Sequence, residues 1–164
     1  MSINKEKRSS DWDDAAAEKI LQEKKGMPGA LLPILHALQE KFGYIAPEFV
    51  PEIAQVLNLS RAEVHGVISF YHDYRQIPPG TQVIKICRAE ACQSVAGRNL
   101  ENHVKQKLGL EYRGTTPSGD YTLEPVYCLG NCACAPSMMM GDKLYGRVTP
   151  EKFDALLDKK EDAA

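Results

Sequence analysis

The 164-residue sequence lacks the features of a membrane, secreted or nucleic-acid-binding protein. Its longest apolar stretch, Ala30 to Leu38, is interrupted by Pro33 and His36 and is far shorter than the roughly 20 residues of a membrane-spanning helix. The N-terminal segment MSINKEKRSSDWDD has no apolar signal core, and the net charge of −2 gives no basic excess. We therefore expect a cytoplasmic protein that binds no nucleic acid and does not insert into a membrane.

The sequence also lacks nucleotide-binding motifs and the pattern of a disulfide-stabilised protein. No G-x-G-x-x-G follows an expected strand and no P-loop is present, so we expect no nucleotide or flavin site in this chain. The five cysteines are an odd number, which without a secretion signal argues against a disulfide framework. Hydrophobic residues make up 43% and charged residues 26%, and these globular values exclude disorder of the whole chain.

Residues 1–78 carry helical patterns without a strand signal, and they predict an N-terminal helical bundle. A first helix is expected to end at Gly26, and the first ten or so residues are polar and expected to be flexible. Apolar residues spaced by three and four predict a helix over Ala30–Phe42, and Pro47 suits the start of a third helix. Ser60-Arg61-Ala62-Glu63 is a capping box that predicts a fourth.

Pro78-Pro79-Gly80 predicts a boundary, after which residues 79–164 alternate strand and helix patterns. Pro125 indicates that its strand lies at a sheet edge or contains a bulge. We expect strands at Thr81–Cys87, Tyr121–Tyr127, Ser137–Met140 and Leu144–Val148, a short one at Glu111–Arg113, a helix over Gln93–Leu108 with Val95 on its core face, and a last helix from Pro150. The order β-α-β-β-β-α is compatible with a thioredoxin-like domain, so the predicted fold class is α+β.

All five cysteines lie in this second region. Cys87 and Cys92 are separated by four residues, Cys128 and Cys132 by three, and each pair falls where an expected strand ends. Four thiolates converging from two such loops can hold a binuclear iron–sulfur cluster. Cys92 also stands just before the expected helix, where backbone amides favour negative charge.

Two other uses of the same sulfurs stay open. A zinc ion also takes four thiolates, which would make the chain a zinc-stabilised adaptor, although zinc knuckles place only two residues between paired cysteines. A thiol–disulfide enzyme is the third possibility, but no C-x-x-C is present. Cys134, Met138–Met140 and the four scattered histidines are expected to pack rather than to bind metal.

The motifs CRAEAC and CLGNC, the Ala135-Pro136 that follows, and GVISFY at Gly66–Tyr71 resemble one known family. This family is the 24-kDa-type iron–sulfur subunits of NADH dehydrogenases, with related subunits of hydrogenases and NAD-dependent formate dehydrogenases. The resemblance covers about Met27 to Leu157. It implies a helical bundle, a thioredoxin-like domain and one [2Fe-2S] cluster on Cys87, Cys92, Cys128 and Cys132, without Cys134.

In detail, Arg88–Ala91, Gln93 and Asn131–Pro136 are most similar to the gamma subunits of soluble, molybdenum-dependent formate dehydrogenases. This resemblance implies an electron-transfer subunit, without catalytic residues, of a complex that oxidises formate to CO2 and reduces NAD+. FMN and NAD are expected on a flavin/NAD-binding partner subunit, and molybdenum on another. The alternatives are the equivalent subunit of respiratory NADH:quinone oxidoreductase or of an NAD-reducing hydrogenase.

Overall fold

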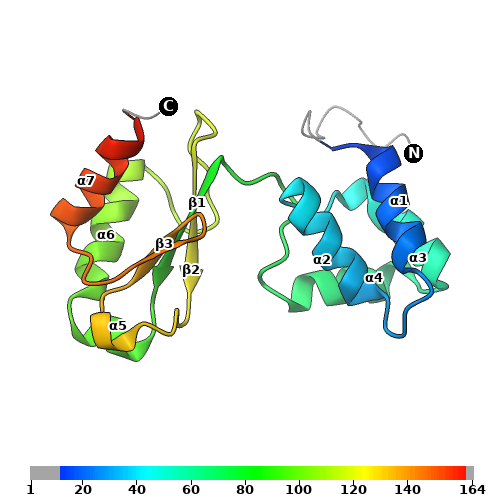
Figure 1. Cartoon of the computed structure of the whole chain (residues 1–164), viewed down its shortest axis with the longest axis horizontal. Helices are drawn as coiled ribbons and strands as arrows, with labels where there is room; N and C mark the ends of the chain where they lie inside the picture. Colours follow the sequence, from blue (N-terminus) through cyan, green and yellow to red (C-terminus); the bar gives the residue numbers. More distant parts are fainter. Residues whose placement is uncertain (1–11, 162–164) are drawn as a thin grey trace. The chain divides into compact units, whose positions relative to one another are not determined.

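The computed structural model describes residues 12–161, and the chain divides into two compact units between Pro78 and Pro79 (Figure 1). The first ten residues, which the sequence predicts to be flexible, lie outside the described residues. Independent folding of residues 1–78 and 79–164 as domains stays a prediction. None of the described helices is long and apolar enough to cross a membrane.

The first unit is helical in its described part, as the sequence predicts. Its elements are α1 (Asp14–Lys24), α2 (Leu31–Phe42), the short 3-10 helix η2 (Pro47–Phe49), α3 (Val50–Leu57) and α4 (Arg61–Phe70). The predicted capping box is confirmed at the start of α4, where the Glu63 backbone N–H donates to Ser60 Oγ and the Ser60 N–H donates to the Glu63 carboxylate. These two bonds satisfy amides that the first turn leaves without helical partners.

One continuous core holds these helices together. The rings of Phe42, Tyr44 and Phe49 surround Trp12 with centroid distances of 4.4, 5.4 and 5.6 Å. Ile34, Leu35 and Leu38 of α2 and Ile53 of α3 are fully buried in the same cluster. The predicted spacing of apolar residues therefore produces the buried faces that hold this unit together.

The second unit contains a sheet with helices packed against it (Figure 1). Its elements are β1 (Gln82–Cys87), α5 (Glu90–Ser94), α6 (Gly97–Leu108), β2 (Tyr121–Val126), the 3-10 helix η3 (Cys132–Cys134), β3 (Met138–Met140), β4 (Lys143–Tyr145) and α7 (Pro150–Glu161). The strand order is β2-β1-β3-β4, with β1 and β2 parallel and the other pairs antiparallel. The predicted α+β class is confirmed, and β2, which carries Pro125, is an edge strand as predicted.

The predicted single helix over Gln93–Leu108 is wrong, because α5 and α6 are separate helices. Ala96 between them has a φ of 67°, which breaks the helical backbone. Val95 is therefore 47% exposed instead of lying on the core face. The core face of α6 begins only at Gly97 and continues through Leu100 and Val104.

Two of the strand predictions also need correction. Glu111–Arg113 forms a turn, in which the Gly114 N–H donates to the Glu111 carbonyl over 3.0 Å. The predicted strand Leu144–Val148 is shorter and shifted, because β4 covers only Lys143–Tyr145. The backbone leaves the sheet after Tyr145 because the Arg147 N–H donates to the Cys134 carbonyl instead of to a strand.

Candidate functional site

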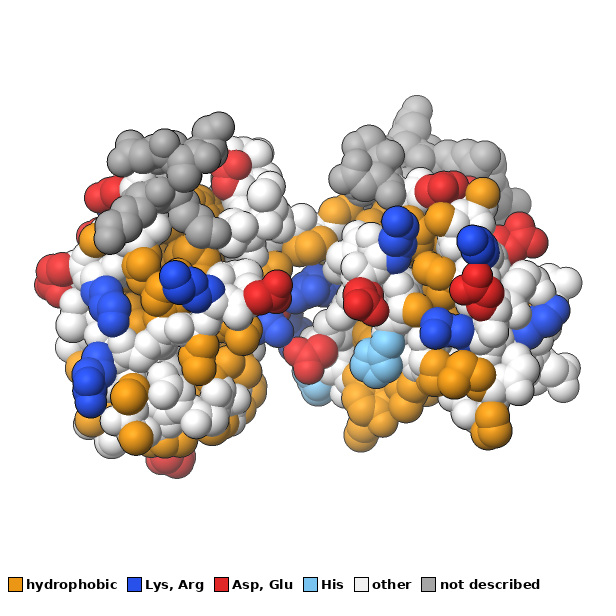
Figure 2. Space-filling model, viewed as in Figure 1, with side chains coloured by type: hydrophobic (Ala, Val, Ile, Leu, Met, Phe, Trp, Pro, Cys, Tyr) orange, Lys and Arg blue, Asp and Glu red, His pale blue; other side chains and the backbone are white. Residues whose placement is uncertain are grey.

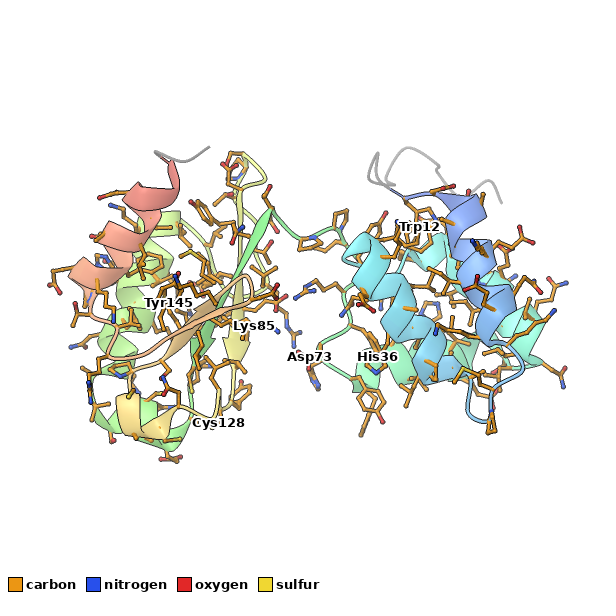
Figure 3. The ribbon with its side chains drawn as sticks, viewed as in Figure 1. Trp12, His36, Asp73, Lys85, Cys128 and Tyr145 are labelled. Atoms are coloured by element: carbon orange, nitrogen blue, oxygen red, sulfur yellow. The ribbon has the colours of Figure 1, made fainter. Side chains whose placement is uncertain are left out.

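Two cysteine-bearing loops leave the sheet at the same edge. Cys87 is the last residue of β1 and lies opposite Val126, the last residue of β2, in the parallel register. Cys128 follows two residues later, and Figure 3 shows it beyond this end of β2. Because parallel strands end at a common edge, the register brings the predicted pairs Cys87–Cys92 and Cys128–Cys132 to one end of the unit.

The first loop buries its two sulfurs. Cys87 is 4% and Cys92 2% exposed, and the Cys87 N–H donates to the Ser137 carbonyl over 3.1 Å. Cys92 lies inside the short helix α5 and not before a helix as predicted, and its N–H donates to the Ala89 carbonyl over 3.0 Å. The Cys92 amide is therefore already hydrogen-bonded within its own helix and is not one of the free amides that the sequence predicts there.

Gly97 supports this loop through its lack of a side chain. A Cβ atom at this position would lie 2.4 Å from the carbonyl oxygen of Cys92. Such a distance is far below van der Waals contact, so only glycine lets α6 start against the backbone of Cys92.

The second loop presents its sulfurs to solvent. Cys128 and Cys132 are both exposed, and their Sγ atoms lie 3.8 Å apart. The Gly130 N–H donates to Cys128 Sγ over 3.3 Å, and Gly130 has a φ of 71°, a left-handed conformation that glycine adopts without strain. Cys128 itself has a φ of 144°, a region that residues with a side chain rarely adopt.

The geometry of the second pair fits two sulfurs bound to one metal. Thiolates bound tetrahedrally over about 2.3 Å lie about 3.8 Å apart, which matches the separation of Cys128 and Cys132. Among the described residues, no three His, Cys, Asp or Glu side chains are grouped to hold a single metal ion. A binuclear cluster has a different requirement, because each of its irons needs only two of the four sulfurs.

The electrostatics of the four thiols also suit a cationic centre. Burial, together with the Cys87 side chain and the charge of Cys132, raises the pKa of the Cys92 thiol. The adjacent Cys128 side chain, and to a smaller degree Cys87, raises the pKa of Cys132. The two pairs therefore lie close enough to oppose each other's ionisation, and bound iron would compensate the four negative charges.

Cys134 and Ser137 support the second loop from beneath. The Cys134 carbonyl accepts from the Arg147 N–H over 2.6 Å, and the buried Ser137 hydroxyl donates to the Asn131 carbonyl over 3.2 Å. The close approach of Gly146, whose Cβ would lie 2.7 Å from that of Cys134, fixes the Cys134 side chain in a packed position. The exclusion of Cys134 from the ligand set stays a prediction.

The other residues that were weighed as ligands lie in the core, in side-chain contacts or, like His65 and His72, exposed at the surface. Met138 and Met140 are buried in the sheet core, as predicted. His103 Nε2 lies 2.9 Å from Asp154 Oδ1 on α7, and the His36 ring packs against Tyr74 in the first unit.

Sequence reasoning did not identify two groups beside the cysteines. Ser137 is buried and hydrogen-bonded under the second loop, and Arg88 forms an ion pair with Glu101 beside the first. The position of Arg88 directly after Cys87 could have indicated that it lies beside the site. The partner Glu101 lies 13 residues away on another element, and only the fold identifies it.

Similarity to known proteins agrees with this geometry. A subunit of an NADP-reducing hydrogenase from Solidesulfovibrio fructosivorans, HndA, is 33% identical over 79% of this chain and 75% of its own length. A subunit of the NADH-quinone oxidoreductase of Thermus thermophilus is 33% identical over 80% of this chain and 74% of its own. An NADH-quinone oxidoreductase subunit from Pseudomonas aeruginosa is 29% identical over 91% of this chain and 90% of its own.

Solved structures share the fold. A crystal structure of an NAD+-reducing [NiFe]-hydrogenase in the H2-reduced state superposes with a TM-score of 0.66 at 21% identity. The match covers 79% of this chain and only 22% of that longer chain. Residues 17–161 match the thioredoxin-like [2Fe-2S] ferredoxins, whose members bind one [2Fe-2S] cluster. With two cysteine loops at one edge of its sheet, this chain belongs to the thioredoxin-like [2Fe-2S] ferredoxin family.

Proposed function

We propose that Cys87, Cys92, Cys128 and Cys132 hold one [2Fe-2S] cluster and that the chain is an electron-transfer subunit of a larger NAD-linked oxidoreductase. The observation that carries this proposal is the convergence of both cysteine pairs on one sheet edge, with a 3.8 Å separation of Cys128 and Cys132. When bound, the cluster would supply one-electron redox chemistry.

The two pairs of proposed ligands differ in their exposure to solvent. Cys87 and Cys92 are buried and hold their side of the site away from water, while Cys128 and Cys132 leave the other side open to a partner. The Gly130 N–H donates a hydrogen bond to Cys128 Sγ, which stabilises the thiolate and its added charge. The rigid sheet behind both loops limits the movement of the ligands when the charge changes.

The parent complex is proposed to be an NAD-dependent formate dehydrogenase, with FMN and NAD on one partner subunit and molybdenum on another. The loop residues Arg88–Ala91 and Asn131–Pro136 support this choice through their similarity to formate dehydrogenase gamma subunits. The relatives that are hydrogenase and NADH-quinone oxidoreductase subunits favour a second candidate, in which the same chain serves one of those complexes.

Metal analysis of the anaerobically purified chain tests the cluster. We expect a red-brown protein with about two irons and two labile sulfides per chain. A colourless protein with one zinc per chain would instead support a zinc-stabilised adaptor.

Co-purification from the native cells tests the parent complex. A tagged chain is expected to bring down a flavoprotein and a molybdenum subunit, and the complex is expected to reduce NAD+ with formate. A complex that contains nickel and reduces NAD+ with H2, or one that carries membrane subunits and reduces quinone, would replace formate dehydrogenase by the corresponding alternative.

A further inference from the structure

An ion pair lies directly beside the first cysteine loop. Arg88 follows Cys87 in the chain, and its Nε donates to Glu101 Oε2 over 3.0 Å. The Glu101 side chain is only 13% exposed and that of Arg88 is 36% exposed. Because Glu101 is largely removed from water, solvent screens this pair less than it would an ion pair on the open surface.

The backbone of Arg88 is fixed on both sides. Its N–H donates to the Val126 carbonyl at the end of β2 over 2.7 Å, and its own carbonyl accepts from Gln93 Nε2 over 2.5 Å. Its guanidinium also lies over the Tyr112 ring, with Cζ 5.2 Å from the ring centroid. These contacts from three elements hold the charge of Arg88 in one place next to Cys87.

Lys105 adds a second positive charge next to this ion pair, and Glu111 balances it with a second negative charge. Lys105 Nζ lies 3.4 Å from Glu101 and 2.8 Å from Glu111, and 4.5 Å from the Tyr112 ring centroid. Burial and the Glu101 carboxylate raise the pKa of Tyr112, so its hydroxyl stays neutral. The two cations and two carboxylates therefore cancel, and loss of any one of them leaves an uncompensated charge.

We propose that Arg88 and Glu101 shift the reduction potential of the cluster in opposite directions, so that each charge limits the effect of the other. This inference rests on the proposed ligation by Cys87 and Cys92. Reduction in a dithionite titration adds one electron to the cluster, and a nearby positive charge stabilises that electron while a negative charge opposes it. Arg88 is thus a positioning residue whose charge favours reduction, and Glu101 limits this effect.

The test is a set of charge-removing variants of the full chain with its cluster. Arg88→Met is expected to lower the midpoint potential and Glu101→Gln to raise it, each by about tenfold in the equilibrium constant for reduction, or about 59 mV for one electron. The double variant is expected to return close to the wild-type potential. EPR-monitored redox titration measures all three, and the signal shape reports whether the cluster itself is intact.

A second ion pair of α6, between Lys107 and Asp154 of α7, provides the control. Lys107 Nζ lies 3.7 Å from Asp154 Oδ1, and Lys107 is six residues beyond Glu101, or about 9 Å further along α6. Lys107→Met and Asp154→Asn are expected to leave the potential unchanged. Shifts of the same size in these controls, or shifts of equal sign in Arg88→Met and Glu101→Gln, would overturn the proposal.

A conservative variant covers the case in which Arg88→Met fails to assemble a cluster. Arg88→Lys keeps the charge and is expected to keep the potential near that of the wild type, and Glu101→Gln still has to raise it. An unchanged potential in Glu101→Gln overturns the inference about the ion pair and leaves the ligand assignment standing. A wild-type chain without iron would instead refute the proposed function.

Discussion

The two units differ in what holds them together. In the first unit, helices bury aliphatic and aromatic faces in a single core, and Phe70 at the end of α4 remains 72% exposed. The surfaces of both units carry hydrophobic side chains among charged ones (Figure 2). In the second unit, a smaller apolar core supports loops whose backbone atoms approach one another closely. Side-chain packing thus holds the first unit together, whereas close backbone contacts hold together the part of the second unit that carries the cysteines.

The glycines show the same difference. Gly66 in the middle of α4 has open space where a side chain would project. At Gly97 and Gly146, a Cβ atom would lie 2.4 and 2.6 Å from the nearest heavy atom. Gly66 is therefore replaceable in principle, while Gly97 and Gly146 belong to the scaffold of the cysteine loops.

The largest expected effect comes from the cysteines of the second unit. Cys87→Ser or Cys128→Ser is expected to abolish the native cluster spectrum, because one iron loses a thiolate ligand. Cys134→Ser is the matched control and is expected to keep the spectrum. Absorbance, EPR and iron content measure the outcome, and a spectrum lost only in Cys134→Ser would reverse the ligand assignment.

Phe49→Ala tests whether the units are independent. Phe49 is buried against Trp12 in the first unit, so the substitution is expected to cost about 3–5 kcal/mol of its unfolding free energy. Urea unfolding followed by circular dichroism is expected to show an early transition while the cluster absorbance persists. Phe70→Ala, at an exposed site, is expected to change stability by no more than about 0.5 kcal/mol. Loss of cluster and helices in one transition would contradict the division into two domains.

Two glycine substitutions, one in each unit, test whether close backbone packing is confined to the cysteine loops. Gly97→Ala is expected to destabilise the second unit by about 1–3 kcal/mol and to accelerate iron loss, because its Cβ collides with the Cys92 carbonyl. Gly66→Ala is expected to stabilise α4 by about 0.4–1 kcal/mol, since it removes freedom from the unfolded chain. Thermal unfolding and the rate of iron transfer to a chelator measure both. Equal tolerance at the two sites would refute the contrast.

The smallest effect on stability is expected from a charged side chain at the surface of the second unit, Asp154. The hydrogen bond from His103 lowers the pKa of Asp154, and Lys107 adds to the shift. A carboxyl group with a lowered folded-state pKa contributes stability above its unfolded pKa of about 3.9, and this contribution is lost as the pH falls through the folded value. Asp154→Asn is therefore expected to cost roughly 0.2–1 kcal/mol at pH 7 and progressively less below about pH 4. Urea unfolding at both pH values measures the difference, and a cost that does not depend on pH would rule out the charge as its origin.

The elements that follow from local rules were predictable from sequence. The capping box at Ser60, the edge position of Pro125 and the start of α7, where the Lys152 N–H donates to Thr149 Oγ1 over 3.2 Å, each depend on neighbouring residues. The same is true of the two cysteine spacings and of the strand ends that they follow. Local chemistry was sufficient in these places because tertiary packing agrees with it.

The rest required contacts between distant residues. The pattern Val95, Leu100 and Val104 is helical, and only the approach of Gly97 to Cys92 shows why the helix breaks at Ala96. The parallel register of β1 and β2, which brings the cysteine pairs together, and the pairing of Arg88 with Glu101 likewise have no local signal. Individual motifs could therefore be recognised in the sequence. The meeting of the two cysteine pairs was implied by the family resemblance, whereas the pairing of Arg88 with Glu101 could not be predicted.

The unequal exposure of the two cysteine pairs has a consequence for biogenesis. Under the proposed ligation, iron and sulfide would enter from the side of Cys128 and Cys132, because Cys87 and Cys92 are buried. That side is also the one left open for a redox partner. If a partner docks on that side, we expect cluster insertion to precede docking, because both would use the same entrance.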